Sequence, residues 1–307
     1  MLDLGGSLGR RFGGIGAAIF NPSLQLEVER AAEVEAEGED ADRAAEFARR
    51  YLAAQALDGG VRVRIRQAIP RHAGLGSGTQ LALSVARGIA ELYELPTATT
   101  ALAAAMARAR RSAIGTWLFD GGGFIVEGGR HERGDRIAPL LARLAIQESW
   151  RCVVAIPRSA NALSGETEVQ AFRELPPPPL REVEHVAHLL VMSLLPALVD
   201  GDLPAFGSAL TEIQQINGSW FSPVQGGPFA SGPSSELIGK MLDWGAAGVG
   251  QSSWGPAVYG IVDGDEAAAQ LAASARLLLD GSGAVYVNQF AGAGARVSVL
   301  HPSPARA

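Results

Sequence analysis

Apolar and polar residues alternate strictly along residues 61–66, where each apolar side chain is followed by an arginine. This period of two predicts a strand with one buried face and one arginine-coated face. Residues 24–28 alternate in the same way and predict a second, half-exposed strand. In residues 40–57 the apolar positions recur at helical spacing with charges on the other face, which predicts an amphipathic helix.

The other apolar runs predict helices and strands in no regular order. Helices are expected over residues 81–92, 99–110, 180–199, 203–216, 234–244 and 265–279. Strands are expected over residues 124–126, 151–156, 257–262, 284–289 and 296–300. Because strands and helices do not alternate as they do in a doubly wound sheet, this order predicts an α+β fold. The strand at 151–156 is a natural start for a second domain, so the expected domains are residues 1–150 and 151–307.

The composition fits a folded protein without a strong preference for anionic partners. Of 307 residues, 47% are hydrophobic and 19% are charged, which is enough to bury a core and excludes a disordered or fibrous chain. The 26 basic and 32 acidic residues give a net charge of −6, so we expect no nucleic-acid partner. A single cysteine, Cys152, excludes an internal disulfide and any multi-cysteine metal centre.

No segment approaches the roughly 18 uninterrupted apolar residues that a membrane span needs. The most apolar run, residues 186–199, contains His188, Ser193 and Pro196. The first residues have neither the basic nor the apolar segment of a signal peptide. We therefore expect a cytoplasmic protein with no membrane partner.

A glycine-rich junction at residues 74–79 separates the strand at 61–66 from the helix at 81–92. Glycine lets the backbone approach a ligand closely, and a helix N-terminus offers unpaired N–H groups that favour phosphate. Ser77 and Thr79 can add hydroxyl donors. The junction therefore predicts a phosphate-binding loop. The alternative is a plain turn in which Ser77 or Thr79 caps the helix.

Two arginine clusters and a second glycine loop also carry candidate chemistry. Arg10 and Arg11 lie next to Gly13-Gly14, and residues 108–111 contain three more arginines. Arginine binds phosphate and carboxylate with two parallel hydrogen bonds, so the clusters indicate an anionic substrate, although each alone is typical of a solvated face. The loop at 248–256 carries three polar residues in apolar surroundings, and it is either ligand-facing or an ordinary connection.

The stretch Gly74–Gln80 resembles the phosphate-binding signature of the GHMP family of small-molecule kinases, and the loop at 248–255 is similar to the C-terminal glycine motif of that family. The resemblance implies a GHMP-kinase-like two-domain fold. Its N-terminal domain is of the ribosomal S5 domain 2 type and its C-terminal domain is ferredoxin-like. Two positions depart from the kinase pattern: Gly78 replaces a serine that helps hold magnesium, and Gly115 replaces an aspartate base. A glycine cannot take a proton from a substrate hydroxyl.

The variants of this chain resemble one branch of the family, the β-ribofuranosylaminobenzene 5′-phosphate synthases of methanopterin biosynthesis. The stretches that carry this resemblance are residues 2–14, 74–80, 111–126, 163–166 and 250–256. The resemblance implies a pentosyltransferase whose substrates are phosphoribosyl pyrophosphate and 4-hydroxybenzoate or 4-aminobenzoate. A ring carbon bonds to the ribose, and carbon dioxide and pyrophosphate leave. The catalytic residues themselves are not assigned.

The same resemblance implies where the substrates bind. Pyrophosphate or the 5′-phosphate is expected on Gly74, Leu75, Gly76, Ser77, Gly78, Thr79 and Gln80. Arg11 or Arg111 would contact a phosphate or the benzoate carboxylate. Other candidate substrate contacts are Gly13, Gly14, His72, Gln251, Ser252 and Ser253. Trp254 is expected either to stack on the aromatic acid or to belong to the core.

Magnesium and a homodimer are also implied by the resemblance, with Asp3 and Glu166 as candidate metal ligands. Two other functions stay open at this point. One is an ATP-dependent GHMP-type kinase that acts on a small alcohol. The other is a non-catalytic relative that binds a phosphorylated metabolite.

Overall fold

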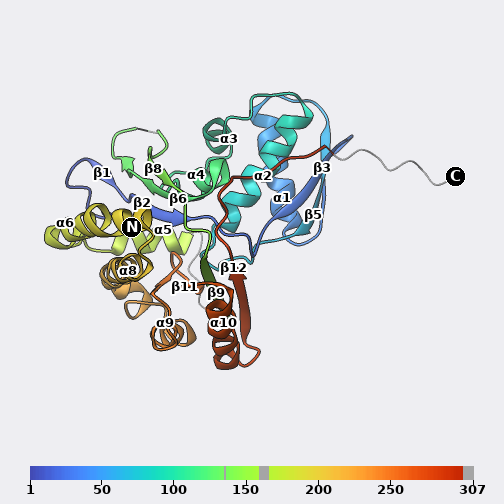
Figure 1. Ribbon diagram of the computed structural model, residues 1–307. Coiled ribbons are helices and arrows are strands. Elements are labelled where there is room, and N and C mark those ends of the chain that lie inside the picture. Colours follow the sequence, from blue (N-terminus) through green and yellow to red (C-terminus); the bar gives the residue numbers. More distant parts are fainter. Residues whose placement is uncertain (135, 159–165, 300–307) are drawn as a thin grey trace.

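The computed structural model describes residues 1–134, 136–158 and 166–299 (Figure 1). The first half of the chain forms β1 (Arg10–Arg11), β2 (Gly14–Ala17), β3 (Gln25–Ala31), β4 (Glu35–Glu37), α1 (Ala41–Ala54), β5 (Gly60–Gln67), α2 (Ser77–Leu92), α3 (Thr99–Ala105), α4 (Ile114–Gly121), β6 (Phe124–Glu127), β7 (Arg130–His131) and β8 (Leu140–Leu144). The second half forms β9 (Trp150–Pro157), α5 (Glu166–Glu174), α6 (Leu180–Leu189), the π-helical turn η1 (Leu190–Leu194), α7 (Leu195–Asp200), α8 (Leu203–Gln225), α9 (Pro233–Asp243), β10 (Gly248–Gln251), β11 (Val258–Asp263), α10 (Asp265–Leu279) and β12 (Gly283–Asn288).

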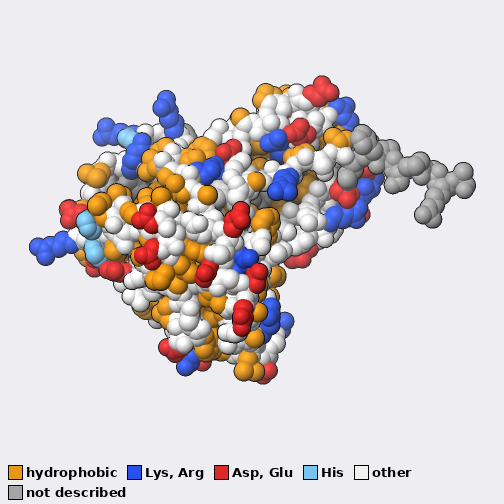
Figure 2. All heavy atoms as spheres, viewed as in Figure 1, with side chains coloured by type: hydrophobic (Ala, Val, Ile, Leu, Met, Phe, Trp, Pro, Cys, Tyr) orange, Lys and Arg blue, Asp and Glu red, His pale blue; other side chains and the backbone are white. Residues whose placement is uncertain are grey.

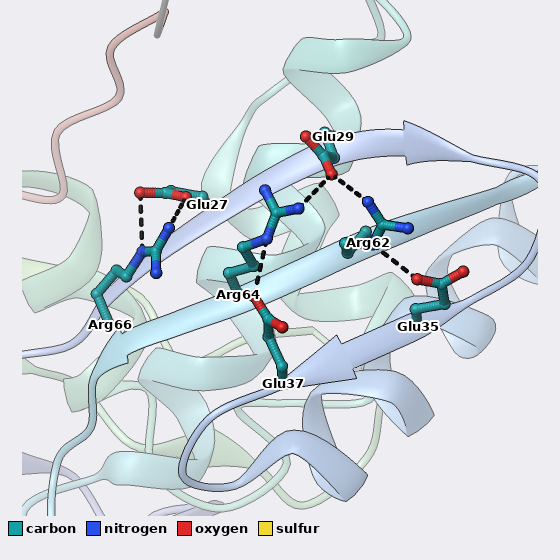
Figure 3. Close-up of polar contacts among 7 residues, drawn as sticks. All are labelled: Glu27, Glu29, Glu35, Glu37, Arg62, Arg64 and Arg66. Atoms are coloured by element: carbon teal, nitrogen blue, oxygen red, sulfur yellow. Dashed lines mark hydrogen bonds and ion pairs between the residues drawn. The ribbon is translucent and has the colours of Figure 1, made fainter.

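The strictly alternating strand, β5, is the centre of a three-stranded sheet in the order β3-β5-β4. Figure 3 shows its arginines on one face, among glutamates from β3 and β4. Arg62 Nη1 lies 2.8 Å from Glu29 Oε1, and Arg64 Nε lies 2.8 Å from Glu37 Oε1. Arg66 is paired in the same way. Carboxylates therefore balance the charge of these three arginines, and the absence of a nucleic-acid partner stays a prediction.

The opposite face of this sheet is buried, as the alternation predicts. Val61 and Val63 are fully buried and pack against α1 and α2. Helix α2 lies close to the sheet, because a Cβ on Gly88 would be only 2.6 Å from Val28 Cγ2. This core fixes the direction of α2, whose first residue, Ser77, lies at the glycine junction.

A smaller sheet, in the order β2-β6-β8, joins the first half of the chain to the second. Phe124 and Val126 of β6 share a core cluster with Trp150 and Phe206. The rings of Phe124 and Phe206 meet edge to face, with their centroids 5.9 Å apart. The chain also returns here at its end, where the Ala291 N–H donates to the Ala18 carbonyl.

Four antiparallel strands form the sheet of the second half, in the order β10-β11-β9-β12. Its central strand β9 is buried along its whole length. Val153 and Ala155 pack against α9 and α10. Cys152 and Val154 alternate with them and pack with Ala73 instead, next to the glycine junction. This sheet therefore supports the loop that precedes α2.

The run Leu180–Asp200, made of α6, η1 and α7, is long and apolar enough to cross a membrane, and only 28% of its most apolar window is buried. Core helices of soluble proteins have the same length and composition, so this single run does not indicate a membrane protein. Pro196 has no N–H to donate to the preceding turn, which accounts for the wider turn at η1. In Figure 2, hydrophobic side chains are visible around α6 and α8 among charges of both signs.

The expected homodimer stays a prediction.

Helix α8 continues to Gln225, whereas the sequence predicted an end at residue 216. The Asn-Gly pair at 217–218 is typical of a turn, but here both residues are buried in the helix. Pro223 cannot donate to the Ser219 carbonyl, and the Ser222 hydroxyl donates to it instead at 2.9 Å. This substitute bond keeps the last turns helical.

Several other expected boundaries were wrong. Helix α3 ends at Ala105 instead of residue 110, because Ala107 and Ala109 adopt positive φ angles of 53° and 57°. Helix α2 starts at Ser77 instead of residue 81. Residues 296–299 form no strand, because alternation alone does not supply a neighbouring strand for pairing. The first residues of the second glycine loop, 248–251, form strand β10.

Candidate functional site

A large cleft lies between the two halves of the chain. It is lined by the N-terminal end of α2, by β2 and α4, and on the opposite side by α8 and the loop that follows β10. Among the residues predicted to bind phosphate or substrate, Arg11 does not line this cleft. The others do, namely Gly13, Gly14, His72, Gly74, Leu75, Gly76, Ser77, Gly78, Thr79, Gln80, Arg111, Gln251, Ser252, Ser253 and Trp254.

The junction before α2 has a shape that requires glycine at two positions. Gly74 has a φ of +83°, and a Cβ there would lie 2.0 Å from the Ser252 carbonyl oxygen. Gly76 has a φ of +70° and is the N-cap of α2, without a side-chain capping bond. The first helical bonds come from the Thr79 N–H and the following N–H, both donated to the Gly76 carbonyl. The N–H groups of the two preceding residues therefore have no helical acceptor, which suits an anion.

Two arginines stand over the first turn of α2. A Cβ on Gly78 would lie 2.7 Å from Arg43 Nη2 and 3.7 Å from Arg108 Nη1. Arg108 also stacks on Phe47, with its guanidinium carbon 4.9 Å from the ring centroid. Burial lowers the pKa of Arg108, and the positive charges of Arg43 and Arg50 lower it further. The buried Nε of Arg108 has no hydrogen-bond partner within the described ranges. Arg43 also pairs with Asp40 at 3.2 Å, and the two guanidinium groups beside the helix N-terminus favour an anion there.

The loop after β10 attaches the second half of the chain to the junction. Its Ser252 hydroxyl donates to the Gly74 carbonyl at 2.9 Å. The Gln251 side chain is used inside the loop, because its Nε2 donates to Gln225 Oε1 at 3.1 Å and its Oε1 accepts from the Ala230 N–H at 2.6 Å. Gln251 therefore shapes the wall of the cleft through bonds to its own half of the protein.

Trp254 belongs to an aromatic cluster behind this loop. It is 7% exposed, and its ring centroid lies 5.3 Å from that of Phe172 and 4.7 Å from that of Phe221. The Arg111 guanidinium carbon lies 5.1 Å from the centroid of Phe172. This packing favours the alternative in which Trp254 is a core residue. Phe172, from the same aromatic cluster, supports the Arg111 side chain at the cleft.

The resemblance to GHMP-type kinases places Gly115 where many of them carry their base. The Gln80 side chain donates to the Gly115 carbonyl at 3.0 Å. A Cβ on Gly115 would lie 3.2 Å from Thr79 Cγ2, so a larger side chain would press against the start of α2. The cleft therefore has no proton acceptor at this position.

Glu127, which sequence analysis did not single out, lies beneath this part of the cleft. It pairs with Gly14 across β2 and β6 and is fully buried. Its Oε1 accepts the Ala113 N–H at 3.4 Å, just before α4. Burial raises the pKa of Glu127 to about 7, against the lowering effect of its hydrogen bonds. The carboxyl group thus supports the segment between Arg111 and α4.

Asp3 and Arg11 shape the N-terminal loop. Asp3 Oδ1 accepts the Gly5 N–H at 2.7 Å and the Gly6 N–H at 3.0 Å. Arg11 Nε donates to the Leu4 carbonyl at 3.0 Å. The side chain of the other metal candidate, Glu166, lies outside the described residues. Across the part of the chain that is described, no group of three or more His, Cys, Asp and Glu could hold a metal ion. The described residues thus form no dedicated magnesium site, and magnesium stays a prediction.

Three residues of this region were missed by sequence analysis. Arg43 lies on the charged side of α1, where nothing distinguishes it from a solvated arginine. Glu127 ends a wholly apolar strand directly before two glycines, which was an available signal for a buried carboxylate. Asn217 lies beyond the predicted end of its helix, so its burial could not be expected.

Comparisons with known proteins identify the family. The family model for the N-terminal domain of GHMP kinases matches residues 41–120, and that for the C-terminal domain matches residues 194–278. The β-ribofuranosylphenol 5′-phosphate synthase of Methanothermobacter thermautotrophicus is 35% identical over 284 residues, which cover 86% of this chain and 85% of that protein. The synthase of the same name from Archaeoglobus fulgidus is 35% identical over 274 residues, covering 86% and 84%.

Solved structures of GHMP-type kinases share the fold. Mevalonate kinase from L. major, in complex with R-mevalonate, aligns with a TM-score of 0.66 at 14% identity over 95% of this chain and 93% of that one. A putative homoserine kinase from Listeria monocytogenes aligns with a TM-score of 0.65 at 15% identity over 96% and 94%. These likenesses confirm the predicted α+β fold, while the domain limits 1–150 and 151–307 stay a prediction. The chain belongs to the GHMP kinase family and, within it, to the family of β-ribofuranosylphenol 5′-phosphate synthases.

Proposed function

We propose that this chain transfers the phosphoribosyl group of phosphoribosyl pyrophosphate to a benzoate, with loss of carbon dioxide and pyrophosphate. Curated relatives that are synthases, 35% identical over 86% of this chain, support an enzyme of this kind. Their product is named as a phenol, which favours 4-hydroxybenzoate over 4-aminobenzoate as the acceptor. The enzyme would act in the cytoplasm, in methanopterin biosynthesis.

One observation carries the proposal at the level of the site. The helix N-terminus crowded by Arg43 and Arg108 faces Gly115, where no general base is present. A phosphoryl transfer to an alcohol needs a base or a positioned proton acceptor. A diphosphate that leaves as an anion needs donors and positive charge instead. The cleft offers the second set of groups and lacks the first at this position.

The bond changes follow from this arrangement. The bond between ribose C1 and the diphosphate oxygen breaks, and negative charge gathers on the diphosphate. The N–H groups of Ser77 and Gly78 and the guanidinium groups of Arg43 and Arg108 stabilise that charge. The ring carbon that carries the carboxylate bonds to C1, and the electrons of the ring–carboxylate bond return to the ring as carbon dioxide leaves. No proton is removed from the substrate, so the reaction needs no base at the position of Gly115.

Magnesium enters this proposal as an ion that accompanies the diphosphate. Mg²⁺ usually keeps several waters and binds phosphate oxygens with only one or two protein carboxylates. A site whose described residues form no acidic cage is compatible with that role.

The experiment that tests the proposed function is incubation with phosphoribosyl pyrophosphate, magnesium and carboxyl-labelled 4-hydroxybenzoate. We expect labelled carbon dioxide in equal amount to pyrophosphate, and none when phosphoribosyl pyrophosphate is omitted. ADP formation from ATP and a small alcohol, without release of label, would support the kinase alternative. Ligand binding without any turnover would support the non-catalytic alternative.

A further inference from the structure

The side chain of Asn217 is buried in the cleft wall without using its hydrogen-bonding groups. It is 6% exposed, and neither Oδ1 nor Nδ2 has a hydrogen-bond partner among the described residues. Buried amides are normally paired, because an unpaired one has lost its bonds to water. In a cavity wall, an unpaired amide is available to bind a molecule that enters the cavity.

The position of Asn217 on α8 shows where its amide lies. Three residues earlier, Gln214 Oε1 accepts the backbone N–H of Gln251 at 3.2 Å. Four residues later, the ring of Phe221 packs on Trp254. Residues three and four apart share a helix face, so Asn217 lies on the face turned toward the loop after β10. Asn217 lines the same cleft as the phosphate-binding junction, which that loop contacts directly.

Apolar residues line part of the cleft that Asn217 also lines. On its own helix, Leu210 and Ile213 line the cleft, and Phe124 and Tyr259 line it from the two sheets. The nearby amide of Gln251 is already bonded within its own half of the protein. An apolar wall that presents an unpaired amide suits a flat aromatic molecule with a polar substituent.

We propose that Asn217 binds the ring hydroxyl of the acceptor and thereby selects 4-hydroxybenzoate over 4-aminobenzoate. This inference rests on the proposed function. A phenol hydroxyl donates one proton and accepts hydrogen bonds, so it can satisfy both Oδ1 and Nδ2 of the amide. An aromatic amino group donates well and accepts poorly, so it would leave Nδ2 unpaired, and an unpaired buried donor penalises that acceptor.

The same contact assists bond formation. When the ring carbon opposite the hydroxyl bonds to ribose C1, the ring becomes electron-poor and the hydroxyl oxygen shares the positive charge. Asn217 Oδ1 accepts a hydrogen bond from the hydroxyl group and so stabilises that charge. The hydroxyl keeps its proton throughout, and the charge disappears when the ring–carboxylate electrons return to the ring. Asn217 is therefore expected to affect kcat as well as the KM for the acceptor.

The test compares Asn217→Leu with the wild type and with Asn288→Leu as a matched control. Asn288 is also buried, but its Oδ1 accepts the Asn21 N–H at 2.6 Å, and it does not line the cleft. For Asn217→Leu we expect a melting temperature equal to or above that of the wild type. The KM for 4-hydroxybenzoate should rise at least about tenfold, and that for phosphoribosyl pyrophosphate should stay within about twofold. Asn288→Leu should lose thermal stability and keep the acceptor KM.

Acceptor preference gives a second readout that a merely structural residue would not change. The ratio of kcat/KM for 4-hydroxybenzoate over 4-aminobenzoate should fall toward one in Asn217→Leu. If that variant does not fold, Asn217→Ser, which keeps a small polar group, should still raise the acceptor KM. An unchanged acceptor KM and preference in a folded variant would overturn the inference while the proposed function stands. A wild-type protein that releases no carbon dioxide would overturn the proposed function itself.

Discussion

Single residues decide the chemistry of this cleft, because the surrounding fold is shared with kinases. Gly115 leaves the position of a base empty, and its contact with Thr79 explains why a larger side chain does not fit there without displacement. Arg43 and Arg108 bring positive charge to the same helix turn from two separate segments. Glu127, next to Ala113, is a buried carboxyl group, and its proton gives stability a measurable pH dependence.

Glu127→Gln should change how stability depends on pH. Burial raises the pKa of Glu127 from an ordinary value of 4.5 to about 7. Between these two values the unfolded chain releases the proton and the folded chain keeps it. The free energy of unfolding therefore falls as pH rises through this window, by about 3 kcal/mol for an isolated group. Glutamine cannot ionise, so the variant should lose less stability over the window.

Urea denaturation at pH 5, 6, 7 and 8 measures this effect. Glu236→Gln on the exposed side of α9 is the matched control and should follow the wild-type profile. A Glu127→Gln profile parallel to that of the wild type would show that the carboxyl group is not held protonated in the folded protein.

At the scale of elements, hydrophobic periodicity predicted the longer helices and strands, but it did not predict α4, α5 or the short strands β1, β2, β4, β7, β8 and β10. Strict alternation predicted β5 with its arginine face and its buried face, because successive residues of a strand point to opposite faces of the sheet. Periodicity failed where tertiary contacts overrode local signals. Asn217-Gly218 resembles a turn, yet packing carries α8 through it, and the alternation at 296–299 found no neighbouring strand.

The candidate site could be predicted only where its signal is local. The junction before α2 is visible as a dense glycine motif, since its positive φ angles demand glycine. Arg43 and Asn217 carry no local signal, because only the packing of α1 and α8 turns them toward the cleft. Trp254 packs against the rings of Phe172 and Phe221 and also lines the cleft, so its contact with a substrate stays a prediction.

The N-terminus of α2 gives a prediction at the same scale. Ser77→Asp places a negative charge in the first turn of the helix, where it suits the helix dipole but repels a diphosphate. We expect the variant to fold and to bind no phosphoribosyl pyrophosphate in isothermal titration calorimetry, whereas Ser77→Ala should retain binding. Thr100→Asp adds the same charge to the first turn of α3, at an exposed position, and should bind like the wild type. Unchanged affinity of Ser77→Asp would show that the diphosphate binds elsewhere.

At the scale of the whole molecule, the two halves meet beside the glycine junction as well as at the β2-β6-β8 sheet. The Ser252 hydroxyl holds the Gly74 carbonyl, and β9 packs its Cys152 side against Ala73. The anion site of the first half and the apolar wall of the second half therefore face the same cleft. That arrangement can hold a charged sugar diphosphate and a flat acceptor together, with the reacting atoms between them.

Phosphoribosyl pyrophosphate and ATP both carry phosphates that could bind at the N-terminus of α2, and the choice between them decides the account. The most direct measurement is calorimetric titration of the wild-type protein with each ligand in the presence of magnesium. We expect binding of phosphoribosyl pyrophosphate with one site per chain and no heat from ATP at the same concentrations. If ATP bound as tightly and displaced phosphoribosyl pyrophosphate, the result would contradict the account and support the kinase alternative.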